Sequence, residues 1–191
     1  MSVSVFPLNA IVCPKGRIAL RIFEPRYLDM VRNCLKHKEN FIITLFMENA
    51  KSEHSFYRVG TEVCIVDFGE MTQNGVLNIV VEGLEQVQLS NLTQQNDGLW
   101  VADIQKSTAE QYLHMPDEFD DLCLVLKALI KHPYVKELDM DIDFDDARQV
   151  GWRLTELLPL GNEQKQYLYE LGSSEQRLSK IADQLSSLVE Q

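Results

Sequence analysis

The side chains that could form a catalytic or metal site are widely spaced in this sequence. No two cysteines have the short spacing of a zinc knuckle or a redox pair, and we expect all four to be reduced thiols: Cys13, Cys34, Cys64 and Cys123. The histidines are equally scattered: His37, His54, His114 and His132. No glycine precedes a lysine, which excludes a P-loop, and neither the Rossmann fingerprint nor the common hydrolase motifs occur. The sequence therefore predicts no catalytic residue, no metal ion and no cofactor.

One segment, residues 139–146, alternates aspartates with apolar residues and has the carboxylates of a calcium loop. An EF-hand loop needs Gly at its sixth position and Glu at its twelfth, but counting from Asp139 these are Phe144 and Val150. We interpret the segment as an exposed connector whose last aspartates cap the next helix, with three side chains turned inward: Met140, Ile142 and Phe144.

Charge is unevenly distributed along the chain. It carries 18 basic and 29 acidic residues, a net charge of −11. Residues 109–191 hold 17 of the acidic and 8 of the basic residues, whereas residues 1–38 hold 7 basic and 2 acidic residues. Because an acidic surface repels phosphates, the overall balance argues against nucleic acid as a partner, although a local basic face remains open.

Length and composition indicate a globular protein. With 191 residues, 45% of them hydrophobic, the chain is long enough to bury a core without disulfides. No apolar run approaches the roughly 20 residues that span a bilayer, and the first residues lack the pattern of a signal peptide. We expect a cytoplasmic protein with no membrane partner.

The first part of the chain has the alternating apolar pattern of β-strands. Two dipeptides, Asn74-Gly75 and Asp97-Gly98, are typical of hairpin turns. A helix is predicted from Pro25, with its apolar stripe at Tyr27, Leu28, Val31, Cys34 and Leu35. The predicted strands cover residues 3–6, 18–23, 41–47, 62–71, 76–82, 86–92 and 99–106. Several such strands in succession suggest a barrel.

The second part has the period of helices. One helix is predicted with Asp117 as its N-cap and Pro133 as its stop, and the next starts at about Asp146. A third covers residues 163–171, and a fourth opens at Ser173 with an apolar seam of Leu178, Ile181, Leu185 and Leu188. This seam is either core or a contact for self-association. The sequence thus predicts an α+β protein with a β-rich part, residues 1–108, and a helical part, residues 109–191, packed together.

A specific series of residues near the N-terminus resembles the signature of the N-terminal, substrate-binding domain of Lon proteases. The series is Phe6, Pro7, Leu8, Pro14, Gly16, Arg21, Phe23, Glu24, Arg26 and Tyr27. Segments 80–84, 152–154 and 158–160, with Lys165-Gln166 and Arg177-Leu178, extend the resemblance over nearly the whole chain. The sequence departs from the family at Cys13 and Lys15, where an aromatic and a second small residue are usual.

The resemblance implies a PUA-like β-barrel with one inserted helix, followed by a helical subdomain. It also implies capture of unfolded or tagged polypeptides, and a free-standing domain without the ATPase and Ser-Lys peptidase domains of Lon. Within the signature, an architectural role for Glu24 and its neighbouring arginines is one interpretation. The other is a basic face that receives acidic groups of a client.

We therefore expect proteins or peptides as partners, bound along a sheet edge or in a groove between barrel and helices. The candidate partner-binding residues are Arg21, Arg26, Arg32, Phe68, Met71 and Trp152. Two other functions stay open. One is an enzyme whose site is assembled from dispersed residues, with the 139–146 segment as its source. The other is a structural or regulatory subunit that docks on a larger oligomer through its last helix.

Overall fold

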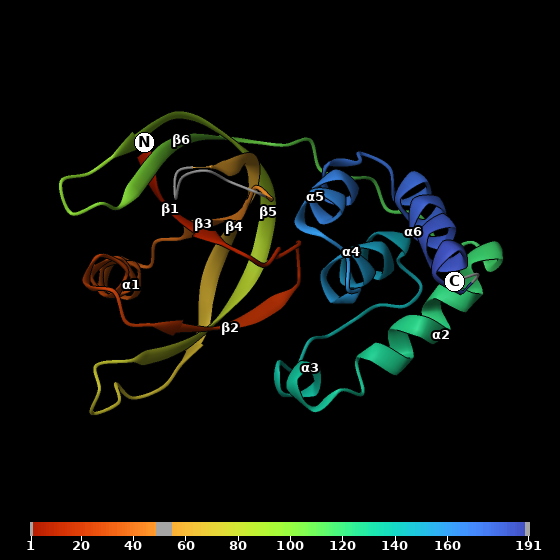
Figure 1. Ribbon diagram of the computed structural model, residues 1–191, viewed down its shortest axis with the longest axis horizontal. Helices are drawn as coiled ribbons and strands as arrows, with labels where there is room; N and C mark the ends of the chain where they lie inside the picture. The colour runs from red at the N-terminus through yellow and green to blue at the C-terminus, as the bar shows by residue number, and fades with distance from the viewer. Residues whose placement is uncertain (1, 49–54, 190–191) are drawn as a thin grey trace. The chain divides into compact units, whose positions relative to one another are not determined.

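A computed structural model of the protein describes residues 2–48 and 55–189, with side chains as far as residue 186 (Figure 1). These residues form an α+β fold and separate into two compact units, Met1–Ser107 and Thr108–Gln191. The first unit holds the strands and one helix, and the second holds the remaining helices. Within the described ranges, no helix has the length and apolar character needed to cross a membrane.

The first unit is a six-stranded sheet in which one strand has three neighbours. The strands are β1 (Ser2–Leu8), β2 (Arg17–Ile22), β3 (Phe41–Phe46), β4 (Phe56–Phe68), β5 (Leu77–Gln94) and β6 (Trp100–Lys106). Their order is β2-β5-β4-β3-β1-β6, and β5 also pairs with β6. Five strands therefore form a closed ring of pairings. Strand β2 lies outside this ring and is paired with β5 alone among the described strands.

Strand β5 is longer than predicted. The prediction of two separate strands, residues 76–82 and 86–92, is wrong, because β5 runs through Gly83 as one strand of 18 residues. The Gly83 N–H donates to the carbonyl of Gly16 at 2.8 Å, so the glycine continues the pairing with β2 and does not interrupt it. The length lets β5 pair with β2 and β4 in its first half and with β6 in its second half.

Both predicted hairpins are present, and each turn has its glycine in the left-handed region. Gly75 has φ of 74° and Gly98 has φ of 86°, whereas the Asn or Asp before it does not have positive φ. In each turn the glycine N–H donates to the residue three positions earlier, at 2.9 Å. Only the glycine of each dipeptide uses its conformational freedom.

Helix α1 (Pro25–His37) connects β2 to β3 and begins as predicted, with Pro25 in its first turn. Its buried stripe differs from the prediction, because Met30 is buried, Leu28 is only partly buried and Leu35 is 38% exposed. Lys38 caps the C-terminal end of the helix in the left-handed conformation, with φ of 57°, and its N–H donates to the Cys34 carbonyl. Tyr27 and Val31 join the main apolar cluster of the unit.

The second unit contains a 3₁₀ turn and five helices among its described residues. They are η1 (Asp117–Phe119), α2 (Asp120–Leu129), α3 (Pro133–Glu137), α4 (Ala147–Leu157), α5 (Asn162–Glu170) and α6 (Ser174–Val189). Two predicted boundaries are wrong. Asp117 lies inside the 3₁₀ turn, which Pro116 precedes. Pro133 begins α3 instead of stopping the previous helix, because proline fits the first helical position.

The core of the second unit surrounds α4, which Figure 1 shows between its neighbouring helices. Val150 and Leu154 of α4 are fully buried with Leu178 and Ile181 of α6. Leu185 packs partly buried against the same core, and the side chain of Leu188 lies outside the described residues. The seam of α6 thus supplies the core of its own unit.

Candidate functional site

The turn that leads into β2 fixes how this strand meets β5. Pro14 and Lys15 occupy the centre of the turn, and the Gly16 N–H donates to the Cys13 carbonyl at 2.9 Å. Lys15 has φ of 65°, the left-handed conformation that the third position of this turn requires. The Lys15 N–H also donates to the Gly83 carbonyl at 2.8 Å, which makes Lys15 the extra residue of a bulge.

The bulge sets which backbone groups of β2 bond to β5. The Gly83 N–H donates to the Gly16 carbonyl, and bonded positions alternate with unbonded ones along an antiparallel ladder. Ile18, Leu20 and Ile22 therefore bond to β5. Asn78 lies opposite Arg21, and its carbonyl accepts a hydrogen bond from the Gly69 N–H at 2.9 Å, on the side of β5 that faces away from β2. This agrees with the alternation. The N–H and C=O groups of the intervening residues point to the free edge of β2: Arg17, Ala19 and Arg21.

The side chains of these same three residues lie on the more exposed face of β2. Ala19 and Arg21 are exposed, whereas Leu20 and Ile22 are buried. Arg17 donates from Nε to a Glu82 carboxylate oxygen at 2.7 Å, so its charge is paired. Arg21 has no ion-pair partner among the described residues. The free edge therefore carries the charge of Arg21 next to the outward-pointing backbone groups of Ala19 and Arg21.

Large apolar side chains are exposed beside the first residues of β5. Phe23 follows the end of β2, which pairs with Leu77, and is 63% exposed. Phe68, at the end of β4 and opposite Ile79, is 58% exposed, and Met71 in the following turn is 52% exposed. This end of the sheet thus offers an apolar surface near the free edge of β2.

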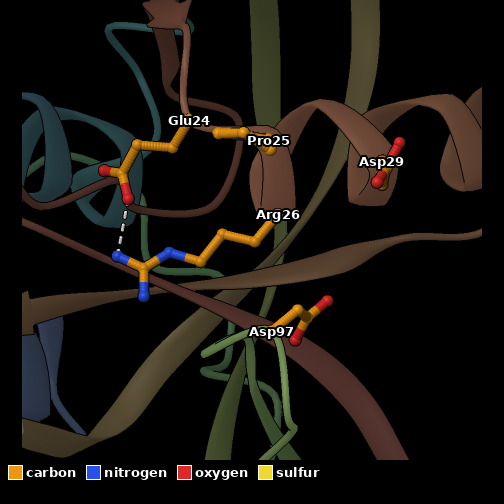
Figure 2. Close-up of a pocket in the computed structure, with 5 residues that line it drawn as sticks. All are labelled: Glu24, Pro25, Arg26, Asp29 and Asp97. Atoms are coloured by element: carbon orange, nitrogen blue, oxygen red, sulfur yellow. Dashed lines mark ion pairs between the residues drawn. The ribbon is translucent and has the colours of Figure 1, made fainter.

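Arg26 is held by its own unit at the start of α1 (Figure 2). Its guanidinium pairs with Glu24 at 2.6 Å, donates to the Gly98 carbonyl at 3.0 Å, and lies over the Tyr27 ring at 4.8 Å. A shallow hollow of about 380 Å³ next to it is lined by Glu24, Pro25, Arg26, Asp29 and Asp97. Three of these five side chains are acidic, so the hollow does not add to a basic face.

Comparison with known proteins identifies the family. A family model described as the substrate-binding domain of ATP-dependent protease La (Lon) matches residues 2–187. The chain belongs to the Lon substrate-binding domain family. A search of curated proteins found no match.

Two solved structures resemble this Lon substrate-binding domain over nearly its whole length. The Lon N-terminal domain protein from Xanthomonas campestris is 30% identical, with a TM-score of 0.76 over 96% of this chain and 98% of that one. The N-terminal domain of the Mycobacterium avium complex Lon protease is 17% identical and shares the fold, with a TM-score of 0.65 over 96% of this chain and 97% of that one.

Most of the signature residues have architectural positions in this Lon domain. The Phe6 ring packs edge-on against Tyr27, with 4.2 Å between their centroids, and both are buried. Pro7 lies in β1 opposite Thr44, beyond the last residue of β1 that pairs with β6, so its missing N–H removes no bond to β6. Arg21 and Phe23 differ from these residues because they are exposed.

Two further candidate residues lie on helices. Arg32 is exposed on α1 and pairs with Asp29 one turn earlier. Trp152 is partly buried on α4 in the second unit, with the Arg177 guanidinium 5.7 Å from its ring centroid. Of the candidate residues in the first unit, Arg21 lies at the free edge of β2, and Phe68 and Met71 are exposed beside the first residues of β5.

Sequence reasoning missed two buried ion pairs in the second unit. The Arg177 side chain is 1% exposed and pairs with Glu110 at 3.0 Å, while its Nε donates to the Leu168 carbonyl at 2.9 Å. Arg153 is 2% exposed and pairs with Glu156 at 2.9 Å. The family resemblance at Trp152-Arg153-Leu154 and Arg177-Leu178 was a signal, but it gave no indication that the arginines are buried.

The acidic connector, residues 139–146, acts as a helix start. The Asp146 carboxylate accepts the Arg148 N–H at 3.0 Å and pairs with its guanidinium at 2.7 Å. Ile142 and Phe144 pack partly buried on the core, while the intervening aspartates are exposed. Residues 2–48 and 55–189 contain no group of three potential ligands able to hold a metal ion.

The cysteines of the Lon domain are free thiols, and burial suppresses their reactivity. Burial raises the pKa of Cys34 to about 11, with a further increase from the nearby Glu39 carboxylate. Burial also raises the pKa of Cys64 and of Cys123. Because the thiolate is the nucleophile, these shifts oppose nucleophilic chemistry at neutral pH.

Proposed function

We propose that this Lon substrate-binding domain holds unfolded or client polypeptides without catalysing a reaction on them. The observation that best supports the proposal is the exposure of Phe23, Phe68 and Met71 beside the start of β5. Phe and Met are enriched at protein interfaces relative to the rest of a protein surface.

An unfolded chain supplies two kinds of group that this surface can bind. Its apolar side chains are accessible, and its backbone N–H and C=O groups are not yet paired. The exposed rings of Phe23 and Phe68 can bury against apolar client residues, and the free edge of β2 can accept main-chain hydrogen bonds. A folded client buries its apolar side chains and pairs its backbone groups, so the domain binds unfolded chains in preference to folded ones.

Calorimetry with one client in two states tests the proposal. We expect a permanently unfolded, reduced and carboxymethylated protein to bind with a Kd in the micromolar range, as modest interfaces do, and its native form to give no heat. The Phe68→Ser/Met71→Ser variant should bind more weakly. Leu124→Ser, which removes a side chain that is 62% exposed on α2, is the matched control. Absence of heat with every unfolded protein tried would show that the proposed function is wrong.

We further propose that the partners are proteins or peptides in the cytoplasm. The net charge of −11 and a pI near 4.8 support a protein partner over nucleic acid. Four free cysteines, three of them buried, support a reducing compartment.

We infer that the ring of strand pairings is a PUA-like barrel. The pairing of β5 with both β4 and β6 supports this, because a sheet that returns to its first strand has no edge within the ring. The edge of β2 is then the accessible edge of the unit.

A further inference from the structure

The free edge of β2 is suited to a particular kind of client segment. Within the described part of the chain β2 pairs with β5 only, and Arg17, Ala19 and Arg21 direct their backbone groups away from β5. Three consecutive outward-facing residues span about 13 Å, enough for a short added strand. No proline interrupts β2, so Ala19 and Arg21 each carry a backbone N–H that points to this edge.

The side chains at this edge disfavour a second copy of β2 as the occupant. If two β2 strands paired antiparallel about Ala19, each Arg17 would lie opposite the Arg21 of the other copy. Like charges directly opposite each other destabilise a strand pair. Edge arginines of this kind prevent self-pairing, and they also select a partner of opposite charge.

The unpaired charge belongs to Arg21. Arg17 is already paired with Glu82 at 2.7 Å, whereas Arg21 has no ionic partner among the described residues. Lys15 adds a second exposed cation at the beginning of the strand. An added strand places its alternate side chains on the face that carries Arg21, and a carboxylate there would form a charge-assisted hydrogen bond.

We propose that an extended segment with acidic side chains at alternate positions, and apolar side chains between them, binds by adding a strand to the free edge of β2. This inference rests on the proposed function and names the class of client that this edge accepts. The acidic side chains of the segment lie beside Arg21, and its apolar side chains lie on the face of Ile18.

Two peptides and their N-methylated forms test the inference with the full chain. The first peptide alternates Asp with Val over ten residues, and the second has Lys in place of each Asp. By fluorescence anisotropy we expect the Asp peptide to bind about tenfold or more tightly than the Lys peptide. N-methylation of the peptide residues whose N–H groups face β2 should abolish binding, and N-methylation of the alternate residues should not.

Variants of the protein separate the side chain from the backbone contribution. Arg21→Glu should lose the preference for the Asp peptide, whereas Lys36→Glu, with the same change of charge on α1, should keep it. Ala19→Pro removes one outward N–H without removing a bond to β5, so it should weaken binding while the circular dichroism spectrum and Tm stay near those of the wild type.

The outcomes distinguish this inference from the proposed function. Equal affinity for the two peptides, or binding that no pattern of N-methylation affects, would overturn strand addition at β2. Binding of unfolded proteins could then still stand on the apolar surface. If Ala19→Pro does not fold, the N-methylated peptides decide the question with the unmodified protein.

Discussion

A side chain at position 83 would collide with the carbonyl group of Cys13. A Cβ atom built on Gly83 lies 2.2 Å from the Cys13 oxygen and 2.9 Å from its carbon. Both are backbone atoms, and the same turn is fixed by two hydrogen bonds to Gly83. The absence of a side chain at this position thus holds the turn before β2 against β5, and positions the strand with the free edge.

Gly83→Ala should therefore be strongly destabilising. Because backbone cannot move aside cheaply, we expect a loss of about 1–3 kcal/mol in the free energy of unfolding, measured by urea denaturation. Gly69→Ala is the matched control, since the nearest atom to its added Cβ is 3.9 Å away. It should change stability by less than about 0.5 kcal/mol. Equal effects of the two substitutions would contradict the close approach.

Lys15→Gly should preserve or increase stability. Lys15 has φ of 65°, a conformation that costs a non-glycine residue about 1 kcal/mol, and glycine removes this cost. Glycine also increases the entropy of the unfolded chain, which offsets part of the gain. Lys15→Val should be destabilising, because a β-branched residue fits this region poorly. In thermal unfolding, the Tm of Lys15→Gly should equal or exceed that of the wild type, and the Tm of Lys15→Val should be lower. A valine variant as stable as the wild type would refute the turn geometry.

Removal of the Arg177 side chain should affect stability much more than removal of an exposed arginine. Arg177→Ala leaves the Glu110 carboxylate unpaired at 10% side-chain exposure, and we expect a loss of about 3–5 kcal/mol. In Arg32→Ala the lost partner, Asp29, is 62% exposed, so the loss should stay below about 1 kcal/mol. Chemical denaturation measures both. The prediction fails if the two losses are similar.

Asp146 should contribute stability that disappears in acid. Burial raises its pKa, but the hydrogen bonds and charge of Arg148 lower it by more, so the pKa lies below its ordinary value of 3.8. A carboxyl whose pKa is lowered by folding stabilises the protein fully above its unfolded-state pKa, and this contribution is lost as the pH falls through the folded-state pKa.

The difference in unfolding free energy between wild type and Asp146→Asn measures this contribution. It should be constant from pH 7 to about 5 and decrease below about 4. Asp141→Asn, which alters an exposed carboxylate of the same connector, should show no such change. A difference that grows as the pH falls would have the wrong sign for a lowered pKa.

The fold was predictable where local chemistry determines it. Pro25 started a helix, and Gly75 and Gly98 formed hairpin turns as predicted. Two predictions failed: a break in the strand near Gly83, and the end of a helix at Pro133. Each residue type is compatible with two different structures. A glycine marks a break or a close approach of two strands, and a proline ends one helix or begins another. Contacts distant in sequence decide between these.

The candidate site was predictable only in part. Arg21, Phe68 and Met71 are exposed and could be named from residue type, but Arg26 could not be recognised as engaged by Glu24 and the Gly98 carbonyl. The free edge of β2 follows from the order of the strands and from the bulge at Lys15. Neither can be recognised from a short motif, because both depend on the pairing of β5 with β2, β4 and β6.

Strand β1 pairs with β6, so the first and last strands of the first unit lie side by side. During synthesis on the ribosome, β1 emerges almost a hundred residues before β6, a delay of about 5 to 20 seconds. The sheet cannot close until that last strand has left the exit tunnel. For this interval β1 exposes an open edge, and a nascent chain of this protein is itself a polypeptide in need of protection.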